Sequence, residues 1–89
     1  MHAVISVIGK DRIGILAAVA NQCAAYHINI LEVSQTILHG IFSMTMIVDM
    51  KDMETSFETF AQEMEKLGIR MELIIKVMNQ EIFDAMHTL

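Results

Sequence analysis

Proline and tryptophan are absent from the 89 residues, and cysteine occurs once, as Cys23. With no proline-rich or other low-complexity stretch to act as a linker, we expect one domain. A single cysteine excludes an internal disulfide, and with it any need for an oxidising compartment. No apolar run approaches the roughly 18 residues that a membrane-spanning helix requires. We therefore expect no membrane partner.

Positive charge is also scarce. Six lysines and arginines stand against eleven acidic residues, for a formal net charge of −5. Nucleic-acid binders cluster positive charge to displace counterions from phosphates, so the balance argues against a nucleic-acid partner. The chain begins as a strand pattern from Ala3, without a basic stretch or cleavage site, and we expect no signal peptide. A cytoplasmic location is the expectation.

Apolar residues, by contrast, are abundant. They make up 54 % of the chain, above the usual range of about 45–50 %. A chain of this length buries only about 60–65 % of the surface that its unfolded form exposes, so its core is thin. We therefore expect part of the apolar surface to be buried against a second copy, as a homo-oligomer, most simply a dimer.

In the first half of the chain, the spacing of the apolar residues changes once, from that of a strand to that of a helix. Residues 3–8 are β-branched and apolar and end at Gly9, which predicts a buried strand. A polar, glycine-bounded loop over 9–14 follows. From Ile15 the period becomes helical, with an apolar stripe formed by Leu16, Val19, Ala20, Cys23 and Ala24.

The second half predicts a hairpin, a helix and a strand. Strand character returns over 29–38, a turn at 39–40 follows, and Phe42, Met44, Met46 and Val48 then alternate with exposed positions. A second helix, capped by Asp52 or Thr55, carries the stripe Phe57, Phe60, Ala61, Met64 and Leu67. Gly68 is expected just past its end, as a left-handed cap, with a strand beginning at Ile69.

This order predicts an α+β, ferredoxin-like βαββαβ sandwich: a four-stranded antiparallel sheet with two helices on one face. We assign residues 1–78 to this domain. Residues 79–89 form a tail packed on it, with Ile82, Phe83 and Met86 together on a short third helix. The other sheet face carries Ile41, Ile47 and Ile74, which indicate either a self-association surface or the ordinary scatter of apolar residues on a surface.

Two segments resemble the ACT domain, the regulatory module of many enzymes of amino-acid metabolism. They are Val7-Ile8-Gly9-Lys10-Asp11-Arg12-Ile13-Gly14-Ile15-Leu16 and Asn29-Ile30, and the resemblance covers residues 2–78. The tail, Ile82-Phe83-Asp84-Ala85-Met86, is similar to that of small stand-alone bacterial ACT proteins. The chain also resembles one half of the glycine-cleavage-system transcriptional repressor. The resemblance implies a non-catalytic regulatory module that binds a small molecule, commonly an amino acid, at an interface between domains.

The residues of this region support the same kind of site. Gly14 opens a helix whose free amides and positive dipole end attract a carboxylate. Asp11 can hold an ammonium group, and Asn29 offers a donor and an acceptor. Carried over by position, the resemblance gives a candidate ligand site made of Asp11, Arg12, Ile13, Gly14, Ile15 and Asn29.

Other interpretations remain open at this point. Gly14 can serve a tight turn, with Asp11 capping the helix and Asn29 merely starting a strand. Many ligand-binding ACT domains have Asn-x-Pro-Gly where this chain has Asp11-Arg12-Ile13-Gly14. The same surfaces can instead form a ligand-free adaptor that docks on an enzyme or transcription regulator.

Known chemistries fit poorly. The loop over 9–14 lacks the Lys-Ser/Thr that follows a phosphate-binding loop, and Cys23 and the dispersed histidines have no metal-ligand spacing. Acyl-phosphate hydrolases of this topology use a loop arginine and an asparagine, which Arg12 and Asn29 imitate, but Asp11 would repel the anion. We expect no enzyme activity, no cofactor and no metal.

Overall fold

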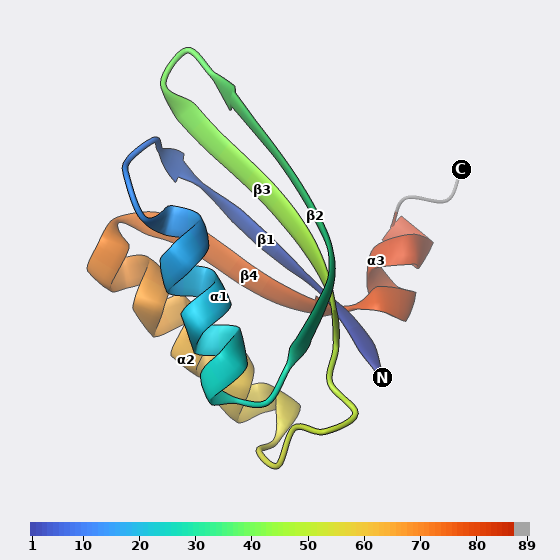
Figure 1. The fold of residues 1–89 in the computed structure, drawn as a ribbon. Coiled ribbons are helices and arrows are strands. Elements are labelled where there is room, and N and C mark those ends of the chain that lie inside the picture. Colours follow the sequence, from blue (N-terminus) through green and yellow to red (C-terminus); the bar gives the residue numbers. More distant parts are fainter. Residues whose placement is uncertain (87–89) are drawn as a thin grey trace.

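The chain runs β-α-β-β-α-β and ends in a short helix (Figure 1). This computed structural model describes residues 1–86. Its elements are β1 (His2–Lys10), α1 (Ile15–Ala25), β2 (Asn29–Leu38), β3 (Ile41–Asp49), α2 (Phe57–Met71), β4 (Leu73–Asn79) and α3 (Gln80–Met86). The strands form one antiparallel-paired sheet in the order β2-β3-β1-β4. The predicted ferredoxin-like fold is confirmed.

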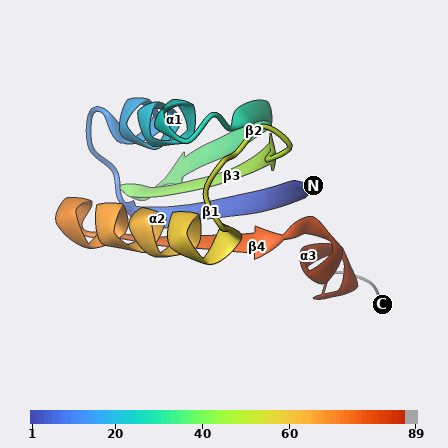
Figure 2. The same ribbon diagram turned by 90° about the horizontal axis from the view of Figure 1, so that it is seen from below.

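Two helices cover one face of the sheet (Figure 2), α1 on the β2 side and α2 on the β4 side. The alternation predicted for β3 is confirmed: Phe42, Met44, Met46 and Val48 are at most 4 % exposed and face the helices. The hairpin turn is confirmed too. His39 and Gly40 both have positive φ, 52° and 78°, as a tight turn matched to the twist of its strands requires.

Helix α1 is rotated relative to its predicted stripe. The buried line is Ile15, Val19 and Cys23, whereas Leu16 is 40 % exposed and Ala24 is exposed. Val19 and Cys23 are buried as predicted, but the prediction was wrong for Leu16 and Ala24, because the helix is apolar almost all round, with alanines on several sides. The spacing of its apolar residues therefore does not identify one buried face. Packing on the sheet buries Ile15, Val19 and Cys23, which are spaced four residues apart.

Helix α2 begins and ends later than predicted. Its N-cap is Ser56, not Asp52 or Thr55, and the Ser56 Oγ accepts a hydrogen bond from the Thr59 amide at 3.2 Å. The helix runs through Met71, and the left-handed residue that ends it is Glu72, with φ of 58°. The strand prediction from Ile69 was wrong for the same reason.

Gly68 lies inside α2 and serves a close approach rather than a turn. A Cβ at this position would lie 2.7 Å from the carbonyl oxygen of Leu73 and 3.1 Å from Ile75 Cγ1. Helix α2 therefore lies directly on the backbone of β4, and only glycine leaves room for it. Gly68 therefore remains within the helix, which ends four residues later than predicted, at Glu72.

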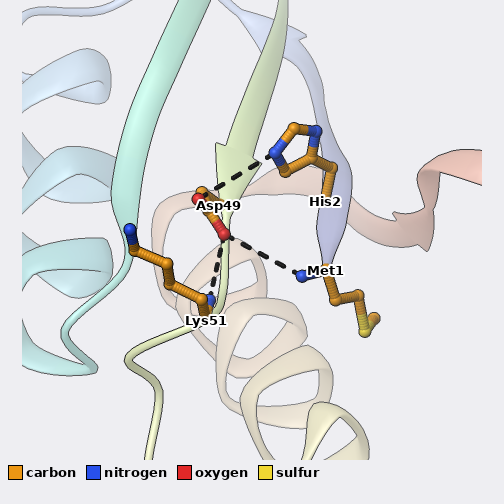
Figure 3. A network of polar contacts seen from close by, with 4 residues as sticks. All are labelled: Met1, His2, Asp49 and Lys51. Atoms are coloured by element: carbon orange, nitrogen blue, oxygen red, sulfur yellow. Dashed lines mark hydrogen bonds and ion pairs between the residues drawn. The ribbon is translucent and has the colours of Figure 1, made fainter.

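Polar contacts of Asp49 connect the end of β3 to the start of β1 (Figure 3). Its Oδ1 accepts a hydrogen bond from the Lys51 amide at 3.0 Å and lies 3.9 Å from the terminal ammonium of Met1. Its Oδ2 lies 3.9 Å from His2 Nε2, an ion pair when the imidazole is protonated. These contacts define the sheet end opposite to the β1–α1 loop.

Helix α3 lies on the other side of the sheet from α1 and α2 (Figure 1) and contacts β1 and β4. Asn79 Oδ1 accepts a hydrogen bond from the Glu81 amide at 2.8 Å, which starts the helix. The rest of the assigned tail, residues 87–89, lies outside the described residues. Within residues 1–86, none of the helices is long and apolar enough to cross a membrane.

The close contact at Gly68 predicts an inverted substitution effect. Glycine to alanine inside a helix ordinarily stabilises by about 0.5–1 kcal/mol. Gly68→Ala should instead destabilise by about 1–3 kcal/mol, because the new methyl overlaps the Leu73 carbonyl and forces α2 away from β4. Urea unfolding of both proteins measures the difference, and an alanine variant as stable as the parent would contradict the packing described.

Candidate functional site

The β1–α1 loop is held by contacts to three other parts of the fold. Gly9, at the end of β1, lies so close to β4 that a Cβ would come within 2.6 Å of Leu73 Cδ2. The Asp11 amide donates a hydrogen bond to the Gly40 carbonyl in the hairpin turn at 2.8 Å. Arg12 Nη1 donates to the carbonyl of Met71, in the last turn of α2, at 3.0 Å. The loop therefore sits on a rigid base.

Gly14 forms an open start to α1. It is the N-cap, with φ of 93°, and no heavy atom outside its own chain neighbours lies within 4 Å of the position of a Cβ. Within residues 1–86 no side chain caps the helix, and the first turn holds no acidic residue. The interpretation that Asp11 caps the helix is therefore wrong. The first turn thus has no side-chain cap and the space beside Gly14 is open, and free amides with the positive end of the helix dipole favour an anion.

A cavity of about 260 Å³ lies between this loop and the junction of α2 with β4. Its lining is Lys10, Asp11, Arg12, Met71 and Glu72. Two cationic and two anionic side chains thus border one small space. Sequence reasoning found Asp11 and Arg12 but missed Lys10 and Glu72. Glu72 was placed inside a strand, and only the true end of α2 brings it to the loop.

The two isoleucines of the predicted site have opposite environments. Ile13, at the tip of the loop, is fully exposed, whereas Ile15 is 2 % exposed and belongs to the core. The Ile15 side chain is therefore structural, and only its backbone can contribute to a ligand site. Ile13 is an apolar side chain presented to solvent.

Strand β2, which begins at Asn29, starts at the opposite end of the sheet from the start of α1 (Figure 1). Asn29 pairs with Asp49, which pairs with His2, at the start of β1. The eleven residues of α1 separate the two positions, a length of about 16 Å. One chain therefore brings Asp11 to Ile15 together but not Asn29. The arrangement of Arg12 and Asn29 that would imitate an acyl-phosphate hydrolase is not formed within the chain.

A second, wider depression surrounds Asn29. It measures about 580 Å³ and is lined by Ala24, His27, Ile28, Asn29, Asp52 and Glu54. Its residues come from the end of α1, the start of β2 and the connection into α2. The cavity beside the β1–α1 loop and the depression around Asn29 share no lining residue and are separate within one chain.

Two further groups of interest have plain structural surroundings. Cys23 is fully buried in the core, and burial raises the pKa of its thiol to about 11. A thiol of this kind is a weak nucleophile at neutral pH. Across residues 1–86, no three side chains of His, Cys, Asp or Glu are grouped so that they could hold a metal ion.

The sequence profile of the ACT domain matches residues 1–78. With the fold and the glycine-opened loop described above, this match covers most of the chain. The chain belongs to the ACT domain family, whose members are regulatory modules.

Within this family the chain groups with UPF0237 proteins. The UPF0237 protein of Listeria innocua is 43 % identical over 89 residues, which is 100 % of both chains. Among solved structures, an ACT domain protein from Streptococcus pneumoniae has a TM-score of 0.82 and 35 % identity, over 93 % of each chain. The predicted resemblance to stand-alone ACT proteins is confirmed.

The likeness in fold to half of a repressor is confirmed as well. A structure assigned as a glycine cleavage system transcriptional repressor matches with a TM-score of 0.70 and 24 % identity. The match covers 85 % of this chain and 43 % of that one. This identity shows a shared fold and nothing of shared ligands.

Substitutions of Gly14 should lower the stability of the protein through backbone strain and not through the volume of the new side chain. Because φ is 93° and the space around it is open, Gly14→Ala should destabilise by about 1–2 kcal/mol. Gly14→Asn should cost less, because asparagine tolerates left-handed backbone better, although its side chain is larger. Urea unfolding of the two variants decides the matter, and equal or reversed costs would mean that side-chain volume, not backbone strain, is limiting.

Cys23 should make the protein less stable in alkaline solution. The unfolded thiol ionises near the ordinary value of 9.0, and the buried one near 11. The unfolded state therefore loses its proton first, so stability is full below pH 9 and falls, by about 2–3 kcal/mol in total, as pH rises to 11. Cys23→Ala, less stable overall because of its cavity, should lose this part of the pH dependence. Parallel slopes for both proteins over this range would contradict the assignment.

Proposed function

We propose that this ACT domain is a non-catalytic sensor of a free amino acid, acting as a homodimer. The ligand site is the loop from Asp11 to Ile15 of one subunit together with Asn29 of the other. The observation that carries the proposal is the start of α1 at Gly14, where no side chain caps the amides and the space beside the glycine is open. These amides suit the carboxylate of an amino acid.

The charges beside the loop suit the other end of the ligand. Asp11 and Glu72 offer carboxylates to an ammonium group, while Lys10 and Arg12 add positive charge for a carboxylate. The cavity of about 260 Å³ is below the range of about 300–1,000 Å³ typical of drug-sized ligands. A small zwitterion matches both its size and its mixture of charges.

Pairing through β2 accounts for the position of Asn29. Strand β2 is an edge strand, and edge strands present unpaired backbone groups that can join a second sheet. Its exposed apolar side chains are Leu31, Val33, Ile37 and Leu38. If two β2 strands pair antiparallel about a two-fold axis, the start of one lies beside the end of the other.

The end of β2 is also the loop end of the sheet. Leu38 precedes the turn at Gly40, whose carbonyl binds the Asp11 amide. Antiparallel pairing would therefore bring Asn29 of the partner subunit toward the β1–α1 loop. The two halves of the predicted site, separate in one chain, would meet across the interface.

The main experiment is a thermal-shift screen against the twenty amino acids. A ligand at 100 times its dissociation constant stabilises by about 2.7 kcal/mol, which for a domain of this size raises the melting temperature by roughly 10 °C or more. We expect at least one amino acid to do so. Asn29→Ala should remove the shift, while Asn21→Ala, the same change at an exposed position of α1, should keep it.

Subunit mixing tests whether the site is shared. Gly14→Val and Asn29→Ala homodimers should both fail to bind the amino acid found by the screen. A mixed dimer of the two variants retains one site made of unaltered residues, so titration calorimetry should recover about half of the parental stoichiometry. No recovery in a folded mixed dimer would place Asn29 outside the site.

An adaptor without a metabolite is the second candidate. Its supporting observation is Ile13, an isoleucine fully exposed at the loop tip, as in a residue that docks on another protein. It predicts no thermal shift with any amino acid, together with co-purification of an enzyme or transcription regulator. Loss of that partner in Ile13→Asp would favour this function over amino-acid sensing.

A further inference from the structure

The sheet face opposite α1 and α2 is covered at one end only. Val4 belongs to this face, since its neighbours Ala3 and Ile5 face the core, yet it is only 2 % exposed. Its strand partners there are Ile47 and Met78, and α3 contacts β1 and β4. Helix α3 therefore roofs the end of the open face where β1 begins.

The other end of this face is bare and apolar. Its exposed residues, on four strands, are Ile8, Leu38, Ile41 and Ile74, from 42 % to 68 % exposed. Ile8 pairs directly with Ile74, and Leu38 with Ile41. The two pairs are diagonal neighbours, since Ile8 lies opposite Ser43, and Ile41 opposite Lys10. We call these four residues the bare patch.

Helix α3 has an apolar side of its own that faces away from the sheet. Phe83 is its half-buried apolar residue, whereas Ile82 and Met86 are 56 % and 66 % exposed. These two are four residues apart and therefore lie on one side of the helix. The open face thus carries a bare patch at one end and an unpartnered apolar stripe at the other.

We propose that a second copy of the chain covers the bare patch with its α3. Two copies stack open face to open face about a two-fold axis, and each α3 fills the bare end of the other. One surface then holds both complementary parts, as an isologous interface requires. The proposal does not depend on amino-acid binding or on pairing through β2.

The dimensions permit this arrangement. A helix is about 10 Å thick, so two stacked sheets would stand one helix layer apart. The nine residues of β1 span about 30 Å and the seven of α3 about 10 Å. The two α3 helices can therefore lie at opposite ends of the layer without meeting.

Charge complements the apolar contact. Lys10 lies at the bare end in register with Ile41, and within residues 1–86 it makes no hydrogen bond or ion pair with another side chain. Helix α3 carries the acidic residues Glu81 and Asp84. Stacking brings the acidic helix of one copy over Lys10 of the other. Opposite charges at the rim of an interface favour its correct orientation.

Mass measurements across a range of concentrations test the surface. Ile82→Asp on α3 and Ile41→Asp on the bare patch should each halve the largest assembly of the parent, because each places a charge in the same contact. Ile69→Asp, at an exposed isoleucine of α2 outside this face, is the control and should leave the mass unchanged. Circular dichroism confirms that each variant is folded.

Cysteine cross-linking tests the pairing directly, with buried Cys23 left in place. Ile82→Cys mixed with Ile41→Cys should give an oxidised species of twice the 10.0 kDa chain mass. The mixture of Ile82→Cys with Ile69→Cys should give much less. Equal yields from both mixtures, or a parental mass unaltered by Ile82→Asp and Ile41→Asp alike, would overturn the proposal. A β2-edge dimer alone would leave both mass and cross-links insensitive to these positions.

Discussion

The burial of β1 is the constraint on which the rest of the structure depends. This strand pairs on both sides, with β3 and with β4, and its inward residues Ala3, Ile5 and Val7 are completely buried. The candidate loop starts where β1 ends, so its direction is set by the best-anchored element of the fold. A segment with open backbone groups is thereby held in place by a rigid scaffold, a common location for binding loops.

Much of the fold could be predicted because one-sided burial leaves a clear period in the sequence. Strand β3 is the best example: every second residue from Phe42 is buried, and the alternation is visible in the letters alone. The period fails where apolar residues surround a helix, as in α1. It also misleads at Gly68, where the glycine fits the backbone of Leu73 rather than a turn. That requirement is tertiary and leaves no local signal.

The candidate site was predictable only in its local part. The positive φ of Gly14 and the open helix start follow from a glycine placed between a strand and a helix. Glu72 could not be found, because its position depends on where α2 ends. The separation of Asn29 from the loop follows from the shared direction of β1 and β2, which are both antiparallel to β3. The loop follows the end of β1, whereas Asn29 is at the start of β2. Matching motif residues to a family does not reveal this direction. The proposed sharing of the site between two subunits would bring Asn29 and the loop together.

The hydrogen bond from the Asp11 amide to the Gly40 carbonyl has a mechanical consequence. It ties the loop to the tip of the β2–β3 hairpin, so a shift of one must be accommodated by the other. The same tip is continuous with the free edge of the sheet. A ligand bound at the start of α1 would therefore be coupled, through this single hydrogen bond, to the geometry of the β2 edge.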